Sequence, residues 1–328
     1  YNPIEAGTIM QKVNRIMGAL QWSEPFYKDQ SFSWLIIILE VLKKAKEPIT
    51  IKSIVRMGVD KKFGLSVVAK LKQDEANREL FESFNRVMKE NLSNITGLLG
   101  QLQQLNNDEF GKIFEPSQNE CQKNFSLESL LSAPGVAYFQ LNVMAYEESA
   151  KALGKLILQD IKGLASDIHA GKLQANQKFF PIFIDEFGAF AIEGFIDFLK
   201  MCRDVGFANH LFFQSLADLD VVSENFKSQV QQNCLTKIIM RTDDPDEVDF
   251  WSSVAGTQDA LESSYQVMTL GSLKLRTGMG NARTTKQMFI EHDVFKQLNI
   301  GEAVLIQKAP FRHDLLQLWW PSHGPYGP

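Results

Sequence analysis

Two adjacent carboxylates, Asp185 and Glu186, follow an apolar run of residues that favour β-strands, from Phe179 to Ile184. Such a run predicts a buried central strand of a parallel sheet. Carboxylates at the end of that strand could hold the water shell of a Mg²⁺ ion and polarise an attacking water molecule. The alternative is a core strand that ends in a solvated acidic pair, because short motifs of this kind also occur by chance.

Two further polar residues lie near the ends of predicted elements in the same region. Gln214 ends the next predicted strand, at 209–214, and comes 29 positions after Asp185. Arg203 lies near the end of the predicted helix between the two strands, and its planar, permanently charged guanidinium suits a bidentate contact with phosphate. The alternative for Arg203 is a residue at a helix C-terminus that complements the helix dipole.

The segments that must position these residues alternate between strand and helix patterns. The sequence predicts strands at 136–141, 179–184, 209–214, 235–240 and 301–306, with helices at 146–165, 192–205, up to about 232 and at 247–254. Residues 265–290 alternate like a hairpin, and 315–320 form a last extended piece. This order is typical of an α/β sheet, mostly parallel, with helices on both faces and ligands bound at the carboxyl ends of the strands.

Residues 28–125 differ from the rest, because their pattern is helical almost throughout and contains no strand signal. We expect helices at 34–45 and 65–71 and one long amphipathic element at 77–105, with Thr50 as the cap of a short helix. Thr8 is predicted to cap an earlier helix. The sequence thus predicts an all-α domain at 28–125, inserted into an α/β domain made of 1–27 and 126–328, with a disordered tail at 321–328.

Composition excludes several classes of protein. The 328 residues are 45% hydrophobic and 22% charged with a net charge of −5, which describes an ordinary globular protein of about two domains. Three separated cysteines and five scattered histidines indicate reduced thiols and no metal motif. No apolar run reaches 18 residues. Without an initiating Met or a signal peptide, the chain is expected to be the interior of a longer protein.

One region is basic. Between Glu40 and Lys72 nine cations face three acids, so this stretch carries a net charge of +6 and the remainder −11. A solvated helical face is one interpretation. The other is a patch that contacts DNA or another substrate. Its candidate residues are Lys43, Lys44, Lys46, Lys52 and Arg56.

Several pieces in this order resemble the TraG/TraD family, the coupling-protein ATPases of type IV secretion and conjugation. Ile184-Asp185-Glu186-Phe187-Gly188 resembles the family's Walker B strand, and Arg203-x-x-Gly206 followed by a strand ending in Gln214 resembles a segment shared with FtsK translocases. Asn233-Cys234 with Arg241-Thr242-Asp243-Asp244-Pro245 is similar to the family's Asn…Asp-Pro segment. Asn2-Pro3 and the helix containing Ser33-Trp34 resemble the entry into its inserted all-α domain.

The resemblance implies a RecA-like P-loop ATPase core and the cofactors ATP and Mg²⁺. It implies that Asp185 holds the Mg²⁺ shell, Glu186 activates water, Gln214 senses the γ-phosphate and Arg203 reaches the nucleotide of a neighbouring subunit. It further implies a homohexamer on the cytoplasmic side of a bacterial inner membrane. Its partners would be DNA, a relaxosome or effector proteins, and the components of a type IV secretion channel.

One family element is missing. The phosphate loop GxxxxGK[ST] does not occur, since Gly154-Lys155-Leu156 and Gly171-Lys172-Leu173 lack both its first glycine and its hydroxyl residue. We therefore expect the chain to start after that loop and after a membrane anchor, and to hydrolyse no ATP by itself. The predicted function is an ATP-driven coupling protein. An FtsK- or HerA-like DNA translocase and a non-hydrolysing recruitment scaffold are the alternatives.

Overall fold

The computed structural model describes residues 1–72, 75–90, 92–107, 110–114, 125–176, 179–270 and 273–319, without the side chains of residues 90, 113, 265–270 and 273–281. The chain divides into two compact units, Tyr1–Lys227 and Ser228–Pro328, with the boundary inside helix α12 (Glu224–Asn233). The predicted tail at 321–328 lies outside the described residues. No helix in the described part of the chain is long and apolar enough to cross a membrane.

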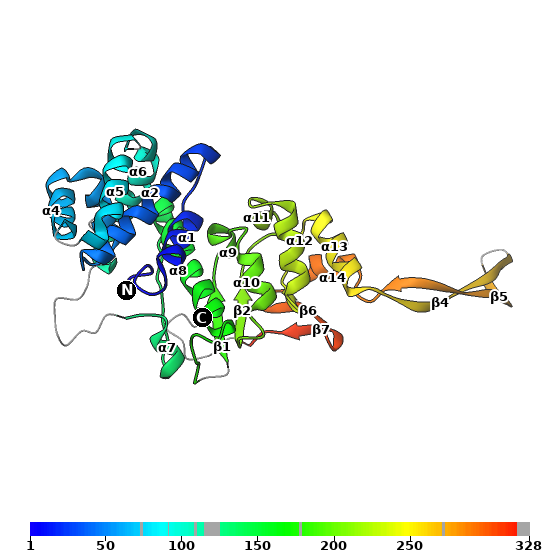
Figure 1. Ribbon diagram of the computed structural model, residues 1–328. Helices are drawn as coiled ribbons and strands as arrows, with labels where there is room; N and C mark the ends of the chain where they lie inside the picture. Colours follow the sequence, from blue (N-terminus) through cyan, green and yellow to red (C-terminus); the bar gives the residue numbers. More distant parts are fainter. Residues whose placement is uncertain are drawn as a thin grey trace. The chain divides into compact units, whose positions relative to one another are not determined.

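The first unit opens with helices. They are α1 (Ile9–Ala19), α2 (Pro25–Lys44), α3 (Ile51–Val59), α4 (Lys61–Leu71), α5 (Arg78–Glu90), α6 (Thr96–Leu105), α7 (Ser129–Ser132) and α8 (Val143–His169), with 3₁₀ turns η1 (Glu75–Asn77), η2 (Leu92–Ile95) and η3 (Gly111–Phe114) (Figure 1). Thr8 and Thr50 cap α1 and α3, each through a capping box, as predicted. Asn142 caps α8, accepting from the backbone N–H of Ala145.

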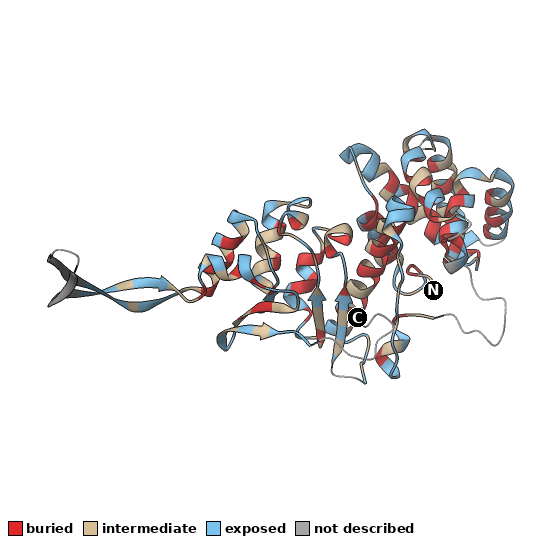
Figure 2. Cartoon of the chain, turned by 180° about the vertical axis from the view of Figure 1, so that it is seen from behind, coloured by how far each residue is buried: buried red, intermediate tan, exposed pale blue. Residues whose placement is uncertain are grey.

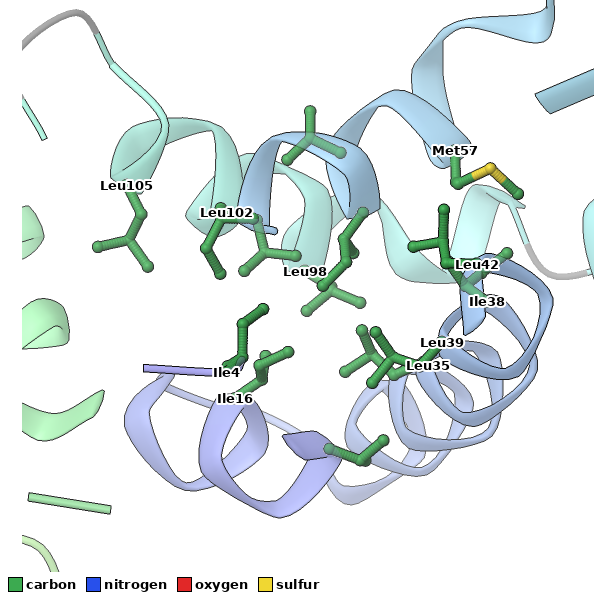
Figure 3. Packing of buried hydrophobic residues seen from close by; sticks show 14 of the residues in the cluster. Ile4, Ile16, Leu35, Ile38, Leu39, Leu42, Met57, Leu98, Leu102 and Leu105 are labelled. Atoms are coloured by element: carbon green, nitrogen blue, oxygen red, sulfur yellow. The ribbon is translucent and has the colours of Figure 1, made fainter. Parts of the chain in front are cut away.

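The apolar faces of these helices meet in one core (Figure 3). Ile4 and Ile16 point into the same interior as Leu35 and Leu39 of α2 and Leu98, Leu102 and Leu105 of α6. Trp34, Ile38 and Ile54 are fully buried in the same cluster. Because α1 and α8 also contribute to it, the predicted all-α region shares its core with the segments on either side. The domain limits at 28 and 125 stay a prediction.

A buried ionic cluster ties the start of the chain to α1 and α8. Arg15 Nη1 lies 2.9 Å from Asp160 Oδ1, and both side chains are less than a tenth exposed. Tyr1 Oη donates to the other oxygen of Asp160 at 2.8 Å. Arg15 and Lys12 also donate to backbone carbonyls of residues 3–6. Lys12 and Arg15 thereby provide hydrogen-bond donors to the carbonyl groups of this loop, which would otherwise be buried without partners.

Two predicted elements are wrong. The single helix expected at 77–105 is divided into α5, η2 and α6, and Ile95 before α6 has non-helical torsion angles. The strand expected at 136–141 is extended but pairs with no described strand, and Val136 and Tyr138 are 93% and 84% exposed. A β-strand needs a neighbouring strand to pair with, and alternation of apolar residues in the sequence does not supply one.

The first unit also contains the strands that carry the acidic pair. Strand β1 (Phe180–Ile184) pairs in parallel with β2 (Phe207–Leu211), in the register Phe180–Phe207 to Ile184–Leu211. The short helices α9 (Phe187–Phe190) and α10 (Phe195–Met201) form the crossover, and α11 (Ala217–Asp220) follows β2. α8 packs against α9 and α10, and Phe190 lies so close to Gly154 of α8 that a Cβ there would clash.

One face of this strand pair is exposed along the described residues. Phe183 is 66% exposed, and its ring stacks on His210 with centroids 4.4 Å apart. Alternate residues Phe180, Ile182 and Ile184 are less exposed. Figure 2 shows the resulting mixture of exposed and partly buried residues along β1 and β2.

The second unit pairs its strands antiparallel, and the predicted parallel pairing is found between β1 and β2 of the first unit. Strand β3 (Thr236–Ile239) pairs with β6 (Glu302–Lys308), and β6 pairs with β7 (Phe311–Gln317). Asp244 is the N-cap of helix α13 (Pro245–Ala255), and its carboxylate accepts from the backbone N–H groups of Asp246 and Glu247. Buried residues of α13, α14 (His292–Gln297) and β6 form the core of this unit: Val248, Trp251, Phe295, Ala303 and Val304.

A long two-stranded ribbon completes the second unit. Strands β4 (Thr257–Leu270) and β5 (Leu273–Met288) pair antiparallel, with a register shift between Tyr265 and Val267. No third described strand pairs with either of them. Within its unit the ribbon extends away from α13 and from the β3–β6–β7 sheet (Figure 1). The hairpin predicted at 265–290 is confirmed, but its first strand starts at Thr257, eight residues earlier than predicted.

Candidate functional site

Asp185 and Glu186 directly follow the carboxyl end of β1, where the sequence predicts a site. Both residues are exposed. Glu186 has left-handed backbone angles, φ 50° and ψ 46°, and its N–H donates to Asp185 Oδ1 at 3.1 Å. A non-glycine residue in this conformation is strained by its Cβ. The backbone is therefore strained at Glu186, directly after the carboxyl end of β1, where the two carboxylates lie.

The structure brings Gln214 to Glu186. The side-chain amide of Gln214 donates from Nε2 to Glu186 Oε1 at 2.9 Å. Because β1 and β2 are parallel neighbours, the residues after their carboxyl ends meet at one edge of the sheet. The predicted group of Asp185, Glu186 and Gln214 is thus assembled at this edge.

Backbone hydrogen bonds extend the β1–β2 pairing up to the site. Phe212 N donates to Ile184 O at 3.0 Å, and Phe187 N donates to Phe212 O at 2.8 Å. Phe187 is fully buried, and its ring lies 5.1 Å from that of Phe195 and 6.1 Å from that of Phe226. The carboxylates are therefore held between a strand and an aromatic anchor, which limits how far they can move.

Asp218 braces the turn that carries Gln214, and the sequence analysis missed it. Its Oδ2 accepts from the backbone N–H groups of Gln214 at 3.0 Å and Ser215 at 3.1 Å. Gly188 lies against it, since a Cβ on Gly188 would stand 2.8 Å from Asp218 Cβ. A carboxylate four residues after Gln214, at the start of a helix, is the signal in the sequence that could have indicated this brace.

Arg203 lies at the opposite end of the strand pair. It sits in the turn before the amino end of β2, whereas Gln214 follows the carboxyl end. The five residues of β2 separate these ends by about 16 Å at the usual rise per residue. Arg203 is 86% exposed, and its nearest carboxylate partner is Asp204 at 3.9 Å. Arg203 therefore does not join the Glu186–Gln214 pair within this chain.

The basic region maps to the end of α2, the turn after it, α3 and α4. Its five candidate residues are all exposed: Lys43, Lys44, Lys46, Lys52 and Arg56. Arg56 is partly occupied, because its guanidinium lies 3.8 Å from the centre of the Phe63 ring and 3.4 Å from Asp60. Glu47 pairs with Lys70. Two of the three acids in this region are thus engaged by its own cations.

The donor set at Asp185 fits a Mg²⁺ ion that arrives with a nucleotide. No group of three or more His, Cys, Asp or Glu side chains in the described part of the chain is placed to hold a metal ion. A nucleotide-bound Mg²⁺ needs no such cage, since one or two carboxylates, waters and phosphates complete its six oxygens. An exposed carboxylate at a strand end is sufficient for that role.

Two of three comparisons with known proteins found matches to this chain. Residues 180–300 match the family model described as the TraM recognition site of TraD and TraG. That span contains Asp185, Glu186, Arg203 and Gln214. No curated protein sequence matches the chain.

Solved structures of the bacterial conjugative coupling protein TrwB share the fold. The unbound form of TrwBΔN70 superposes with a TM-score of 0.64 at 11% identity, covering 99% of this chain and 71% of that chain. The complex with the ATP analogue ADPNP superposes with a TM-score of 0.63 at 12% identity, covering 100% of this chain and 73% of that chain. The complex with ADP and Mg²⁺ superposes with a TM-score of 0.59 at 12% identity, covering 100% of this chain and 72% of that chain.

The resemblance to TraG/TraD coupling proteins is confirmed by the family model together with these structures. The predicted fold class, a RecA-like α/β core with an all-α domain, is confirmed by the likeness to TrwB. The site residues rest on the geometry of this chain.

Proposed function

We propose that this chain is the motor part of an ATP-driven coupling protein, which recruits DNA, protein or both to a type IV secretion channel in conjugation or effector export. The observation that carries the proposal is the 2.9 Å hydrogen bond from Gln214 to Glu186, at the carboxyl ends of two parallel strands. The likeness to TrwB, whose structures include complexes with ADPNP and with ADP and Mg²⁺, supports ATP and Mg²⁺ as ligands.

Each residue at this edge has a role that its chemistry allows. Asp185 would hold waters of the Mg²⁺ shell, and the bound ion supplies positive charge beside the phosphates. Glu186 would accept the proton of the attacking water. The Gln214 amide has two N–H donors, so one can orient Glu186 while the other contacts phosphate.

Arg203 would act on the nucleotide of a neighbouring copy. Its exposure and its place at the other end of β2 argue against a role beside Glu186 in the same chain. A guanidinium that reaches phosphate from outside stabilises charge that develops during phosphoryl transfer. We therefore infer that the working form is a homo-oligomeric ring, for which a hexamer is the proposed state.

The basic region is the proposed substrate surface. Lys43, Lys44, Lys46, Lys52 and Arg56 are exposed on the all-α part, where phosphate groups or acidic peptides could reach them. The family description names TraM recognition, which supports a relaxosome protein among the partners. The proposed location is the cytoplasmic side of a bacterial inner membrane, beside a type IV secretion channel.

Two other functions can be distinguished from the proposed coupling protein. An FtsK- or HerA-like translocase would use the same strand-end residues but would not need a helical domain of about a hundred residues. A non-hydrolysing scaffold would keep the fold without a phosphate loop, and none of the form GxxxxGK[ST] occurs in these 328 residues. The scaffold is favoured if the coding sequence before Tyr1 also lacks such a loop.

The decisive experiment compares the 328-residue chain with a version extended upstream to include GxxxxGK[ST]. We expect the extended protein to hydrolyse ATP with Mg²⁺ and the 328-residue chain to hydrolyse none. Glu186→Gln should lower the turnover number of the extended protein by about 10²- to 10⁴-fold while nucleotide binding persists. Gln232→Leu, at an exposed glutamine outside the site, is the matched control. Turnover by the 328-residue chain alone would contradict the expectation that this chain hydrolyses no ATP by itself, and an active Glu186→Gln variant would overturn the proposed role of Glu186.

A further inference from the structure

A cavity of about 460 Å³ lies in the first unit, where the end of α1, the end of α6 and the first half of α8 come together. Its lining residues lie within 19–23, 101–105 and 148–155, so it shares none with the carboxyl ends of β1 and β2. Sites for small molecules in proteins have volumes of about 300–1,000 Å³. The cavity is therefore large enough to hold a ligand of its own.

The wall formed by α1 and α6 is apolar and fixed by hydrogen bonds. The side-chain amide of Gln101 accepts from the backbone N–H of Gln21 and donates to its carbonyl, both at 2.9 Å. Trp22 Nε1 donates to a backbone carbonyl of α1 at 2.8 Å, which anchors the indole ring. Leu20 and Leu105 are buried beside it. This wall offers a ligand an apolar surface that is already ordered.

The wall formed by α8 is charged. Glu148, Lys151 and Lys155 follow one another at spacings of three and four residues, so they share one face of the helix. Lys151 pairs with Glu147 at 2.8 Å, and Glu148 accepts from the Gln21 side chain at 3.4 Å. Lys155 forms no ion pair and no hydrogen bond with any residue that the structure describes. Its ammonium group is thus the unused charge in this cavity.

The surroundings of Lys155 make that charge costly. The residue is half-buried in the middle of α8. Burial lowers the pKa of Lys155, the nearby charge of Glu148 raises it, and Lys151 lowers it further. An ammonium group that has lost part of its water without gaining a counterion is stabilised by an anion that enters from outside.

We propose that this cavity binds an organic carboxylate with an apolar group the size of one ring, its carboxylate on Lys155 and its apolar group beside Trp22. A single negative charge fits, because Lys151 is already engaged by Glu147. A phosphate dianion needs more donors than one ammonium group provides, and the carboxylate of Glu148 in the same wall repels a second charge.

Other ligands fit the cavity less well. A metal ion would need several oxygen or nitrogen donors, but Glu148 is the one acidic residue in the lining and two lysines accompany it. A nucleic-acid strand is held by many cations along its phosphates, whereas this cavity offers one that is unpaired. A carboxylate has two sources, a free organic acid and the side chain of an acidic residue in a partner protein, and the experiment separates them.

The experiment is a ligand-observed NMR titration of the 328-residue chain with benzoate, benzamide and phenyl phosphate. These probes share a ring and differ in charge. We expect benzoate to bind saturably, benzamide to bind about tenfold or more weakly, and phenyl phosphate to bind no more tightly than benzoate. The titration needs neither nucleotide nor an assembled ring, so its outcome is separate from that of the proposed ATPase.

Variants of α8 localise the binding. Lys155→Met keeps the apolar stem and should weaken benzoate binding by about 10- to 100-fold, while Lys155→Arg should retain it. Lys155→Met should unfold at no lower temperature than the unchanged chain, because Lys155 has no partner to lose. Ala152→Phe should block the cavity by filling it. Lys200→Met, at an exposed lysine of α10 outside the cavity, is the matched control and should bind benzoate like the unchanged chain.

A second pair of probes identifies the source of the carboxylate. It is a short acetylated peptide with one glutamate between two leucines, and its glutamine counterpart. Tighter binding of the glutamate peptide than of benzoate, lost with glutamine, indicates a partner protein; benzoate binding that the peptide does not displace indicates a free acid. Three results would each overturn the proposal: no saturable binding of either carboxylate, benzamide or phenyl phosphate binding as tightly as benzoate or more so, and carboxylate binding that Lys155→Met leaves intact.

Discussion

The carboxylate of Glu186 accepts a hydrogen bond of 2.9 Å from the amide of Gln214, although the two residues are 28 positions apart in the chain. Glu186 makes this contact from a left-handed turn and Gln214 from a turn braced by Asp218. Neither side chain is buried, so the pair is positioned by its backbone more than by packing. Substitutions that change the two turns should therefore change the site.

The first prediction concerns the strain at Glu186. Both Glu186→Gly and Glu186→Ala remove the carboxylate, but only glycine tolerates φ 50° without strain. We expect the glycine variant to be more stable than the alanine variant by about 1 kcal/mol, measured as the free energy of unfolding in urea. Lys46, with φ 56°, should show the same order. At Asp185, where φ is not positive, glycine should be the less stable; the same order at all three positions would refute the strain.

The second prediction tests the contact between Gly188 and Asp218. A Cβ on Gly188 meets Asp218 Cβ at 2.8 Å and its carbonyl oxygen at 3.2 Å, so backbone must shift. Gly188→Ala should lower the free energy of unfolding by about 1–3 kcal/mol and reduce ATP turnover in a hydrolysing form of the protein. Gly100→Ala is the control. Nothing lies within 4 Å of its added methyl group in α6, so it should stabilise by about 0.5–1 kcal/mol.

Asp185 could be predicted from the sequence and Asp218 could not, because different features of the structure position them. Asp185, Glu186 and Gln214 follow strand patterns, and the carboxyl ends of parallel strands meet wherever such strands pair. Asp218 was missed because its function depends on how α9 and α11 pack, which is set by tertiary contacts such as that with Gly188. Periodicity likewise predicted a strand at 136–141 but could not supply its partner, and it could not show that β3 pairs antiparallel with β6.

A third prediction concerns the buried pair of Arg15 and Asp160. Asp160→Ala removes the carboxylate that lies 2.9 Å from a guanidinium less than a tenth exposed, and it leaves that charge without a counterion. The variant should lose about 3–5 kcal/mol of unfolding free energy in urea. Glu82→Ala, which breaks the exposed pair with Arg78, should cost less than about 0.5 kcal/mol. Equal losses at the two sites would contradict the buried arrangement.

A fourth prediction follows from Arg203. Since its side chain is 86% exposed and touches little, Arg203→Ala should change the unfolding free energy by less than about 0.5 kcal/mol. In an assembled, hydrolysing form it should abolish turnover, and mixing it with a Glu186→Gln chain should restore activity at mixed interfaces. No recovery on mixing would place Arg203 in the same site as Glu186 and contradict the geometry.

The last prediction concerns pH. Burial, and next the charge of Arg15, lower the pKa of Lys12 to about 8 from its ordinary 10.5. Between these values Lys12 is neutral in the folded chain and charged in the unfolded chain, so the unfolded chain binds more protons and stability rises with pH. Below pH 8 both states carry the charge, and this source of pH dependence disappears.

Lys12→Met should be less stable overall, because the carbonyls of Ile4 and Glu5 lose their donor. It should also lose the rise in stability between pH 8 and 10. The measurement is urea unfolding of both chains at pH 7, 8, 9 and 10, compared as a difference so that other titrating groups cancel. The window ends at pH 10 because burial raises the pKa of Tyr1 well above 10, which reverses the slope at higher pH. Parallel curves for the two chains would show that Lys12 keeps its ordinary pKa in the folded state.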